Sequence, residues 1–363
     1  MVIDRRTVLA ALLAGAFAPR VAVAARRDVY VSCRLDAEQN ASVSCFDENG
    51  HELFATSLPA RGHDTLERPG AGEVIVFARR PGAWMMVIDA ATGTIRSSVA
   101  ASPHRQFCGH GVFSKDGTLL YATENDDETN QGVIGIYDAK AAYRRVGEVP
   151  SFGVGPHDIT LSPDGRDLFI ANGGMRTDLK TGRDFLLETD APPNLVRFDL
   201  RANTRRDVIE LDSQLRKLSI RHLDAQQDGT VAFGCQHQGE ADDLPPLVGL
   251  WTKSGKTEFL ASEDTALARM KNYVGSVAFN ADGTLLAATS PHGGQVMLWS
   301  MAERRFLTAV TKTDVCGIAP IADGFVATSG NSGVQEIGHD GALEGEPRLL
   351  GFVWDNHLLQ LKG

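Results

Sequence analysis

The sequence predicts an all-β protein, a seven-bladed β-propeller in which a C-terminal strand closes the N-terminal blade. Short apolar runs recur along the chain, turn residues separate them, and the whole unit repeats every ~40 to 65 residues, the period of propeller blades. Glycine is abundant, with 37 residues, and it often follows Asp between two apolar runs. Asp and Gly both tolerate the positive φ that tight turns between antiparallel strands require.

The blades can be followed in chain order from the residues that open their first strands. Six units open at His63, His110, His157, His222, Ser276 and Cys316. The N-terminal strands, residues 29–46, form the remaining blade but lack a first strand. Residues 354–361 can supply it, which would hide the edge of the sheet. Apart from residues 263–271, no segment has a convincing helical period.

The N-terminus has the pattern of an export signal. Arg5 and Arg6 precede the apolar run 8–17, and small residues follow at the expected cleavage site. We therefore predict a twin-arginine signal peptide over residues 1–24 and a single propeller domain over 25–363, located in the periplasm. The apolar run is too short to span a bilayer, so the mature chain is expected to have no integral membrane segment.

Charge and cysteine content restrict the function further. The net charge is −10 and no long run of Lys or Arg occurs, which argues against nucleic acid as a partner. Of five cysteines, Cys33 and Cys45 lie in two strands of an expected hairpin. Symmetric pairing about the turn places them opposite each other, as a disulfide or as two buried thiols.

Residues 155–172 resemble the blades of YVTN-type and lactonase-like propellers. Nearly the whole mature chain also resembles an uncharacterised family of exported bacterial propellers. The segments that carry this second resemblance are 123–126, 171–177, 218–223, 272–278, 314–317 and 354–358. Genes of that family typically lie near those of imelysin-type and di-haem peroxidase-like proteins. The resemblance therefore implies the fold, export, a place in iron uptake and such proteins as partners, but no reaction.

Histidines recur at one position of the repeat. His63, His110, His157 and His222 start first strands, and His357 opens the closing strand. First strands line the central channel of a propeller, so these side chains are expected at one mouth of it. Cys316 stands at the same position in another blade. Imidazole and thiolate are preferred ligands of borderline transition metals, which predicts a site for iron or copper.

The ligand set we expect is the adjacent pair His110 and His157, with a water or a rim carboxylate such as Glu124 completing the shell. The alternative is structural, with each histidine bonded to a neighbouring blade's backbone. Loops after the second strands should surround the same mouth. They supply the candidate rim residues Arg79, Glu124, Asn125, Asp126, Asn172, Arg176, Arg221 and Gln236.

Other functions remain open alternatives. A lactonase-like hydrolase would use a histidine at the mouth as general base and an arginine of the rim to hold an anionic substrate. A docking scaffold would bind partner proteins on its rim. The chain contains no phosphate loop, no Gly-x-Ser-x-Gly motif and no His-Glu-x-x-His motif, and it has no Cys-x-x-Cys-His haem site.

Overall fold

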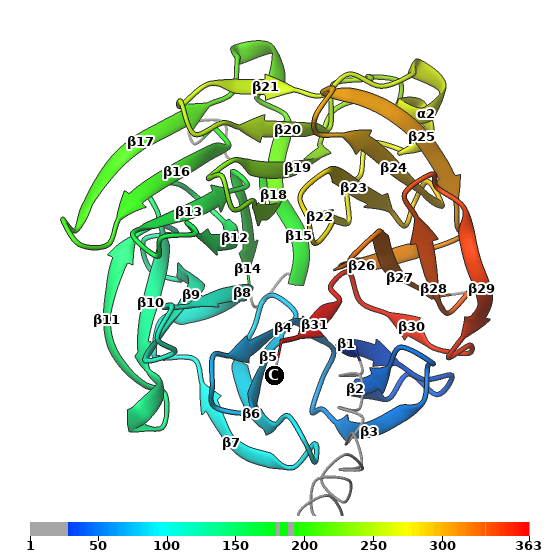
Figure 1. The fold of residues 1–363 in the computed structure, drawn as a ribbon. Helices are drawn as coiled ribbons and strands as arrows, with labels where there is room; N and C mark the ends of the chain where they lie inside the picture. Colours follow the sequence, from blue (N-terminus) through cyan, green and yellow to red (C-terminus); the bar gives the residue numbers. More distant parts are fainter. Residues whose placement is uncertain (1–27, 179–181, 188–191, 331, 363) are drawn as a thin grey trace, which may run out of the picture.

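The computed structural model describes residues 28–178, 182–187, 192–330 and 332–362, and for 176–178 and 182–187 it describes the backbone only. Seven antiparallel sheets stand around a central axis as the blades of a propeller (Figure 1). The predicted fold class and the number of blades are confirmed. The predicted signal segment, with Arg5 and Arg6, lies outside the described residues.

Blades 1 to 4 each form one sheet. Blade 1 contains β1 (Val29–Leu35), β2 (Ala41–Asp47), β3 (Glu52–Ser57), β30 (Val353–Trp354) and β31 (Leu359–Leu361). Blade 2 contains β4 (Gly62–Arg68), β5 (Glu73–Ala78), β6 (Trp84–Asp89) and β7 (Ile95–Ala100). Blade 3 contains β8 (Arg105–Phe113), β9 (Leu119–Asp126), β10 (Gly132–Asp138) and β11 (Arg144–Pro150). Blade 4 contains β12 (Pro156–Leu161), β13 (Asp167–Asn172), β16 (Asn194–Asp199) and β17 (Thr204–Glu210).

Blades 5 to 7 complete the ring. Blade 5 contains β18 (Leu218–Ala225), β19 (Val231–His237), β20 (Val248–Trp251) and β21 (Thr257–Phe259). Blade 6 contains β22 (Ser276–Phe279), β23 (Leu285–Ser290), β24 (Gln295–Ser300) and β25 (Arg305–Thr311). Blade 7 contains β26 (Val315–Ile321), β27 (Gly324–Ser329), β28 (Val334–Gly338) and β29 (Leu343–Arg348). The short helices are η1 (Ala139–Ala141), η2 (Ser213–Leu215) and α2 (Asp264–Arg269).

The turns between first and second strands follow from the Asp-Gly dipeptides. Gly165 has a φ of +75° and its N–H donates to the carbonyl of Ser162 at 2.7 Å. Gly283 has a φ of +73° and closes the equivalent turn of blade 6. Glycine adopts this left-handed conformation without steric cost, so these hairpins form from local sequence.

The core lies between neighbouring blades. Tyr121 and Ile134 of blade 3 are buried in one cluster with Ile159, Leu168 and Ile170 of blade 4. Every residue of the second strand β13 is buried, whereas the outer strand β3 alternates between exposed and half-buried positions. Inner strands are therefore covered on both faces, and the outer strands face solvent.

The C-terminus closes the ring, as expected, but through two short strands. Both β30 and β31 pair with β1, which makes them the innermost part of blade 1. Trp354 is 1% exposed and packs edge-on against Phe46 at 5.4 Å between ring centroids. Residues 355–358 leave the sheet between the two strands, which carries Asp355, Asn356 and His357 to the channel.

The expected pairing of Cys33 with Cys45 is wrong. Cys45 lies opposite Val31, and Cys33 lies opposite Val43, so the two thiols are offset by two positions. Asp36 determines this register because its carboxylate accepts hydrogen bonds from the main-chain and side-chain nitrogens of Asn40. Both cysteines are buried and free.

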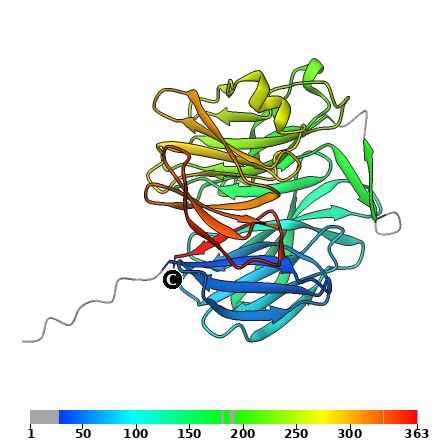
Figure 2. The same ribbon diagram turned by 90° about the vertical axis from the view of Figure 1, so that its right-hand side faces the viewer.

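Loops on one face of the propeller surround the channel mouth. Because successive strands are antiparallel, the connections after second strands and those before first strands share this face. The longest of them carries the hairpin of β14 (Met175–Asp178) and β15 (Gly182–Leu187). Figure 2 shows this green hairpin standing away from the blades. In the described part of the chain, no helix is long and apolar enough to cross a membrane.

Candidate functional site

Five histidines from five blades meet at the channel. The ring centroid of His110 lies 4.6 Å from that of His157 and 4.7 Å from that of His357. His63 is 4.8 Å from His110, and His222 is 4.9 Å from His157. Four of the rings are at most 5% exposed, and the side chain of His357 is 13% exposed. Residues up to 294 positions apart in sequence thus form one compact group, which we call the histidine cluster.

The register places these histidines at two adjacent positions instead of one. His63 and His157 lie in β-bulges of β4 and β12, where two residues oppose one on the neighbouring strand. An aspartate follows each of them, Asp64 in blade 2 and Asp158 in blade 4.

In blade 5 the bulge falls between Ile220 and His222, so Arg221 takes the bulge position. His222 then stands where blades 2 and 4 have an aspartate. In β8 the bulge covers residues 108–110, and His110 is its last member. The expectation of one equivalent position was therefore wrong by one residue for these two histidines.

Asp355 holds His63 in a fixed orientation. Its Oδ1 lies 2.6 Å from His63 Nδ1, and its Oδ2 accepts from Arg61 Nε at 2.7 Å and Arg79 Nη1 at 3.3 Å. Burial acts to raise the pKa of Asp355, but His63 and the two guanidinium groups outweigh it and hold that pKa well below its usual range. The ionised carboxylate keeps the proton on Nδ1, which leaves Nε2 of His63 as the free lone pair.

His110 lies between two other carboxylates. Its Nδ1 is 3.5 Å from an oxygen of Asp64 and 3.5 Å from an oxygen of Asp158. Nδ1 of His357 is 4.0 Å from Asp64. The Nε2 atoms of His110 and His357 have no hydrogen-bond partner among the described protein groups. Both nitrogens of His222 and Nδ1 of His157 also lack a hydrogen-bond partner among the described groups.

The cluster is neutral and strongly desolvated. Burial, followed by the charges of neighbouring groups, lowers the pKa of His110, His157, His222 and His357 well below the ordinary value of 6.5. Burial and the charge of Asp64 raise the pKa of Asp158 well above 3.8. Neutral imidazoles with unused lone pairs are the form in which histidine binds metals.

Three of the histidines have ligand atoms close enough for one ion. The nitrogens offered by His63, His110 and His357 all lie within 4.8 Å of one another. Metal–nitrogen bonds are about 2.0–2.1 Å long, so an ion would require only a small inward movement of these rings. Cys316 is not in this group, because it packs in an apolar cluster with Trp354 and its Sγ contacts the carbonyl of Asp314.

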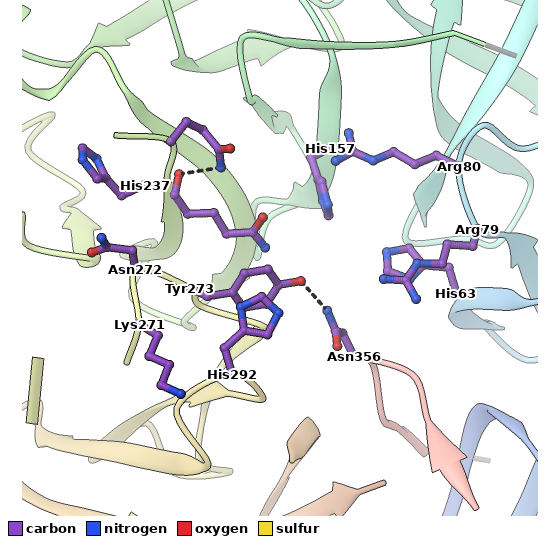
Figure 3. A pocket seen from close by; sticks show the side chains of 12 residues that line it. His63, Arg79, Arg80, His157, His237, Lys271, Asn272, Tyr273, His292 and Asn356 are labelled. Atoms are coloured by element: carbon purple, nitrogen blue, oxygen red, sulfur yellow. Dashed lines mark hydrogen bonds between the residues drawn. The ribbon is translucent and has the colours of Figure 1, made fainter. Parts of the chain in front are cut away.

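A pocket of about 410 Å³ opens above the histidine cluster (Figure 3). His63 and His157 belong to both the cluster and the pocket wall, whereas His110, His222 and His357 do not line the pocket. The other lining residues come from the end of second strand β19, from loops after second strands, from the connection before β22 and from the closing segment. They are Arg79, Arg80, Gln236, His237, Gln238, Lys271, Asn272, Tyr273, His292 and Asn356.

Most of the expected rim residues do not line the pocket and instead contact other residues of the blades. The carboxylate of Glu124 accepts from Tyr137 Oη at 2.5 Å and Arg145 Nη2 at 2.9 Å, so it does not complete a metal shell. Asn172 donates to the carbonyl of Ser151 at 2.8 Å.

Asp126 caps its own loop and pairs with Arg105 at 2.6 Å. Asn125 is buried beside it, with its side-chain oxygen unpartnered among described groups. Arg221 is fully buried, with Nη2 2.7 Å from Sδ of Met175. The structure does not describe the side chain of Arg176. Only Arg79 and Gln236 line the pocket.

Sequence reasoning missed the carboxylates and part of the pocket. The repeated His-Asp dipeptides at residues 63–64 and 157–158 were a signal for Asp64 and Asp158. Asp355 had the weaker signal of a polar Asp-Asn-His run inside an apolar closing strand. No sequence signal pointed to Lys271 or Tyr273. They precede a first strand whose opening residue is not a histidine.

Comparison with known proteins gives a family but no activity. The family model described as "Protein of unknown function (DUF1513)" matches residues 56–361, so the chain belongs to that family. No curated protein matches the chain. Among solved structures it is similar to hydrazine synthase of Kuenenia stuttgartiensis, with 14% identity and a TM-score of 0.64. That likeness covers 83% of this chain and 90% of the other, and at this identity it supports the propeller fold alone.

Proposed function

We propose that this DUF1513 protein binds a transition-metal ion at the histidine cluster and handles iron or copper in the periplasm. The observation that carries the proposal is a set of buried imidazoles with ring nitrogens that have no partner among the described protein groups, Nε2 of His110 and Nε2 of His357 among them. Leaving a buried polar atom unpaired costs about 1–3 kcal/mol, so a cluster of them requires a reason. A metal ion would use the lone pairs and offset that cost.

The ligands we assign are His63, His110 and His357. Each is backed by a carboxylate: Asp355 for His63, and Asp64 for the other two. Carboxylates behind ligating histidines fix the tautomer and raise the basicity of the ring. A bound cation would also favour ionisation of Asp64 and Asp158, whose pKa values burial now raises.

The choice of metal follows from the donor atoms. Imidazole nitrogen suits copper, iron, zinc and nickel, whereas a site for magnesium or calcium would be built from oxygen. The preference for iron or copper, the periplasmic location and the imelysin-type or di-haem peroxidase-like partners rest on the twin-arginine pattern and on the resemblance of the sequence. They are part of the proposal.

Metal binding can be tested on untagged protein. We expect elemental analysis to find about one ion per chain and calorimetric titration with Cu(II), Fe(II) and Zn(II) to give a site that His110→Ala abolishes. His339→Ala is the matched control, because its side chain is 65% exposed and lies in the turn between the two outer strands of blade 7, β28 and β29. Wild-type protein that takes up no metal at neutral pH, or a His110→Ala variant that binds as well, would return the histidines to a structural role.

A further inference from the structure

The pocket above the histidine cluster is positively charged. Arg79, Arg80 and Lys271 line it, and no Asp or Glu is among its described lining residues. Such a wall is unusual in a chain whose net charge is −10. A pocket that only admitted bare metal cations would be expected to have acidic walls, because like charges slow the approach of an ion.

At Arg79 and Lys271 the positive charge is only partly neutralised from behind. Among the described residues, Asp355 is the one carboxylate that contacts Arg79, and it is shared with Arg61. One carboxylate thus faces two guanidinium groups. The ammonium of Lys271 pairs with no described carboxylate, and its charge reaches His292, whose pKa burial and Lys271 together lower.

Neutral donors complete the wall. Asn356 Nδ2 donates to the hydroxyl of Tyr273 at 3.3 Å, so that hydroxyl keeps its own proton to donate elsewhere. Tyr273 also packs against His292, at 4.1 Å between ring centroids. The pocket therefore has two guanidinium groups, an ammonium and a phenol hydroxyl, all of them hydrogen-bond donors.

The cations stand on separate walls. In Figure 3, Arg79 and Arg80 reach in from blade 2 on one side, and Lys271 comes from the connection before β22 on another. Two opposed cationic walls suit a ligand with anionic groups at separate positions. A small molecule with several carboxylates has such groups, and a volume of about 410 Å³ is in the range of small-molecule sites.

We propose that this pocket binds a small oligocarboxylate, which contacts Arg79, Arg80 and Lys271 and supplies oxygen donors to the metal at the histidine cluster. The inference rests on the proposed function for its second part only. Three neutral histidines leave a divalent ion with its full charge and with open coordination positions, and both features favour an anionic ligand on the pocket side. His63 belongs to both the pocket wall and the proposed metal ligands, so the two sites adjoin.

The test is calorimetric titration with citrate, using metal-free and Cu(II)-loaded protein. Acetate and inorganic phosphate are the single-group anions for comparison. We expect citrate to bind metal-free protein more tightly than either, and to bind the Cu(II)-loaded protein more tightly still, with a change in the visible absorption of the copper. Lys271→Gln and Arg80→Gln should each weaken citrate binding by about tenfold, the loss of one charged hydrogen bond.

Lys253→Gln is the matched control, because Lys253 lies in the loop between β20 and β21, on the opposite face, and should leave citrate binding unchanged. Citrate that binds no better than acetate or phosphate, that is insensitive to both charge variants, or that only strips copper into solution overturns the inference. His110→Ala separates the two proposals: it should abolish metal uptake and preserve citrate binding by the metal-free protein. Citrate binding without any metal uptake would refute the metal site alone.

Discussion

Replacing His222 by leucine should stabilise the metal-free protein. The side chain is 2% exposed, and neither of its nitrogens has a partner among the described protein groups. Leucine has a similar volume and no polar atoms to satisfy. Because an unsatisfied buried polar group costs about 1–3 kcal/mol, we expect a gain of about 1–2 kcal/mol at pH 8. With an unfolding entropy of ~2.1 cal/mol/K per residue, each kcal/mol raises the Tm of a chain this size by about 1.3 °C.

The gain should grow as the solution becomes acidic. In the folded protein the pKa of His222 is well below 6.5, mainly because of burial, and in the unfolded chain it is near 6.5. Above pH 6.5 both states are neutral and the histidine makes no pH-dependent contribution. Below pH 6.5 this histidine becomes protonated in the unfolded chain but stays neutral in the folded protein, so the stability of the wild type falls as the pH falls. At pH 5.5 this difference is about 1.4 kcal/mol for one histidine.

Urea denaturation at pH 8 and pH 5.5 measures both parts, on protein stripped of metal with a chelator. His339→Leu is the control, since an exposed histidine should change stability by no more than ~0.5 kcal/mol at either pH. A His222→Leu variant that is less stable than wild type at pH 8 would show that the ring bonds to the protein or to bound water. A stability difference that does not depend on pH would refute the reasoning about its protonation.

Three further predictions concern the scaffold and its export. Ending the chain at Gly351 removes β30 and β31, exposes the edge of β1, and should cause aggregation or a large fall in Tm; a soluble truncation with unchanged melting would contradict the closure. Asp224→Ala removes the carboxylate that accepts from the main-chain N–H of Phe279 at 2.7 Å in the next blade, and should cost about 1–3 kcal/mol in urea denaturation. Equal stability of that variant would mean the contact between blades contributes nothing. Changing Arg5 and Arg6 to lysine should leave unprocessed precursor in the cytoplasm on fractionation, whereas normal export would exclude the twin-arginine route.

Sequence alone was sufficient for the architecture because the signals are local. An Asp-Gly turn and the apolar runs beside it lie within about twenty residues, so each hairpin is encoded by contiguous sequence. The closing strand was also predictable, since residues 354–361 include the apolar side chains of Trp354, Leu358, Leu359 and Leu361, and a propeller with an unpaired inner edge is unstable. The recurrence of histidine at the starts of first strands pointed to the channel, because equivalent positions of the repeat lie at equivalent places around the propeller axis.

Only the tertiary structure decided how the side chains at the channel meet. A β-bulge lies at the start of each of these first strands, and His110 and His222 stand where Asp64 and Asp158 stand in other blades. The distance to the Asp-Gly turn carries this offset, because Asp164 follows His157 by seven residues whereas Asp116 and Asp228 follow their histidines by six, but it does not show which side chains meet across the channel. The same holds for Asp355, which reaches His63 across 292 positions. The sequence determines which blades form and in what order, because turns and apolar runs act locally. The choice of partners, charges and pocket walls depends on contacts between blades, which exist only once the ring has closed.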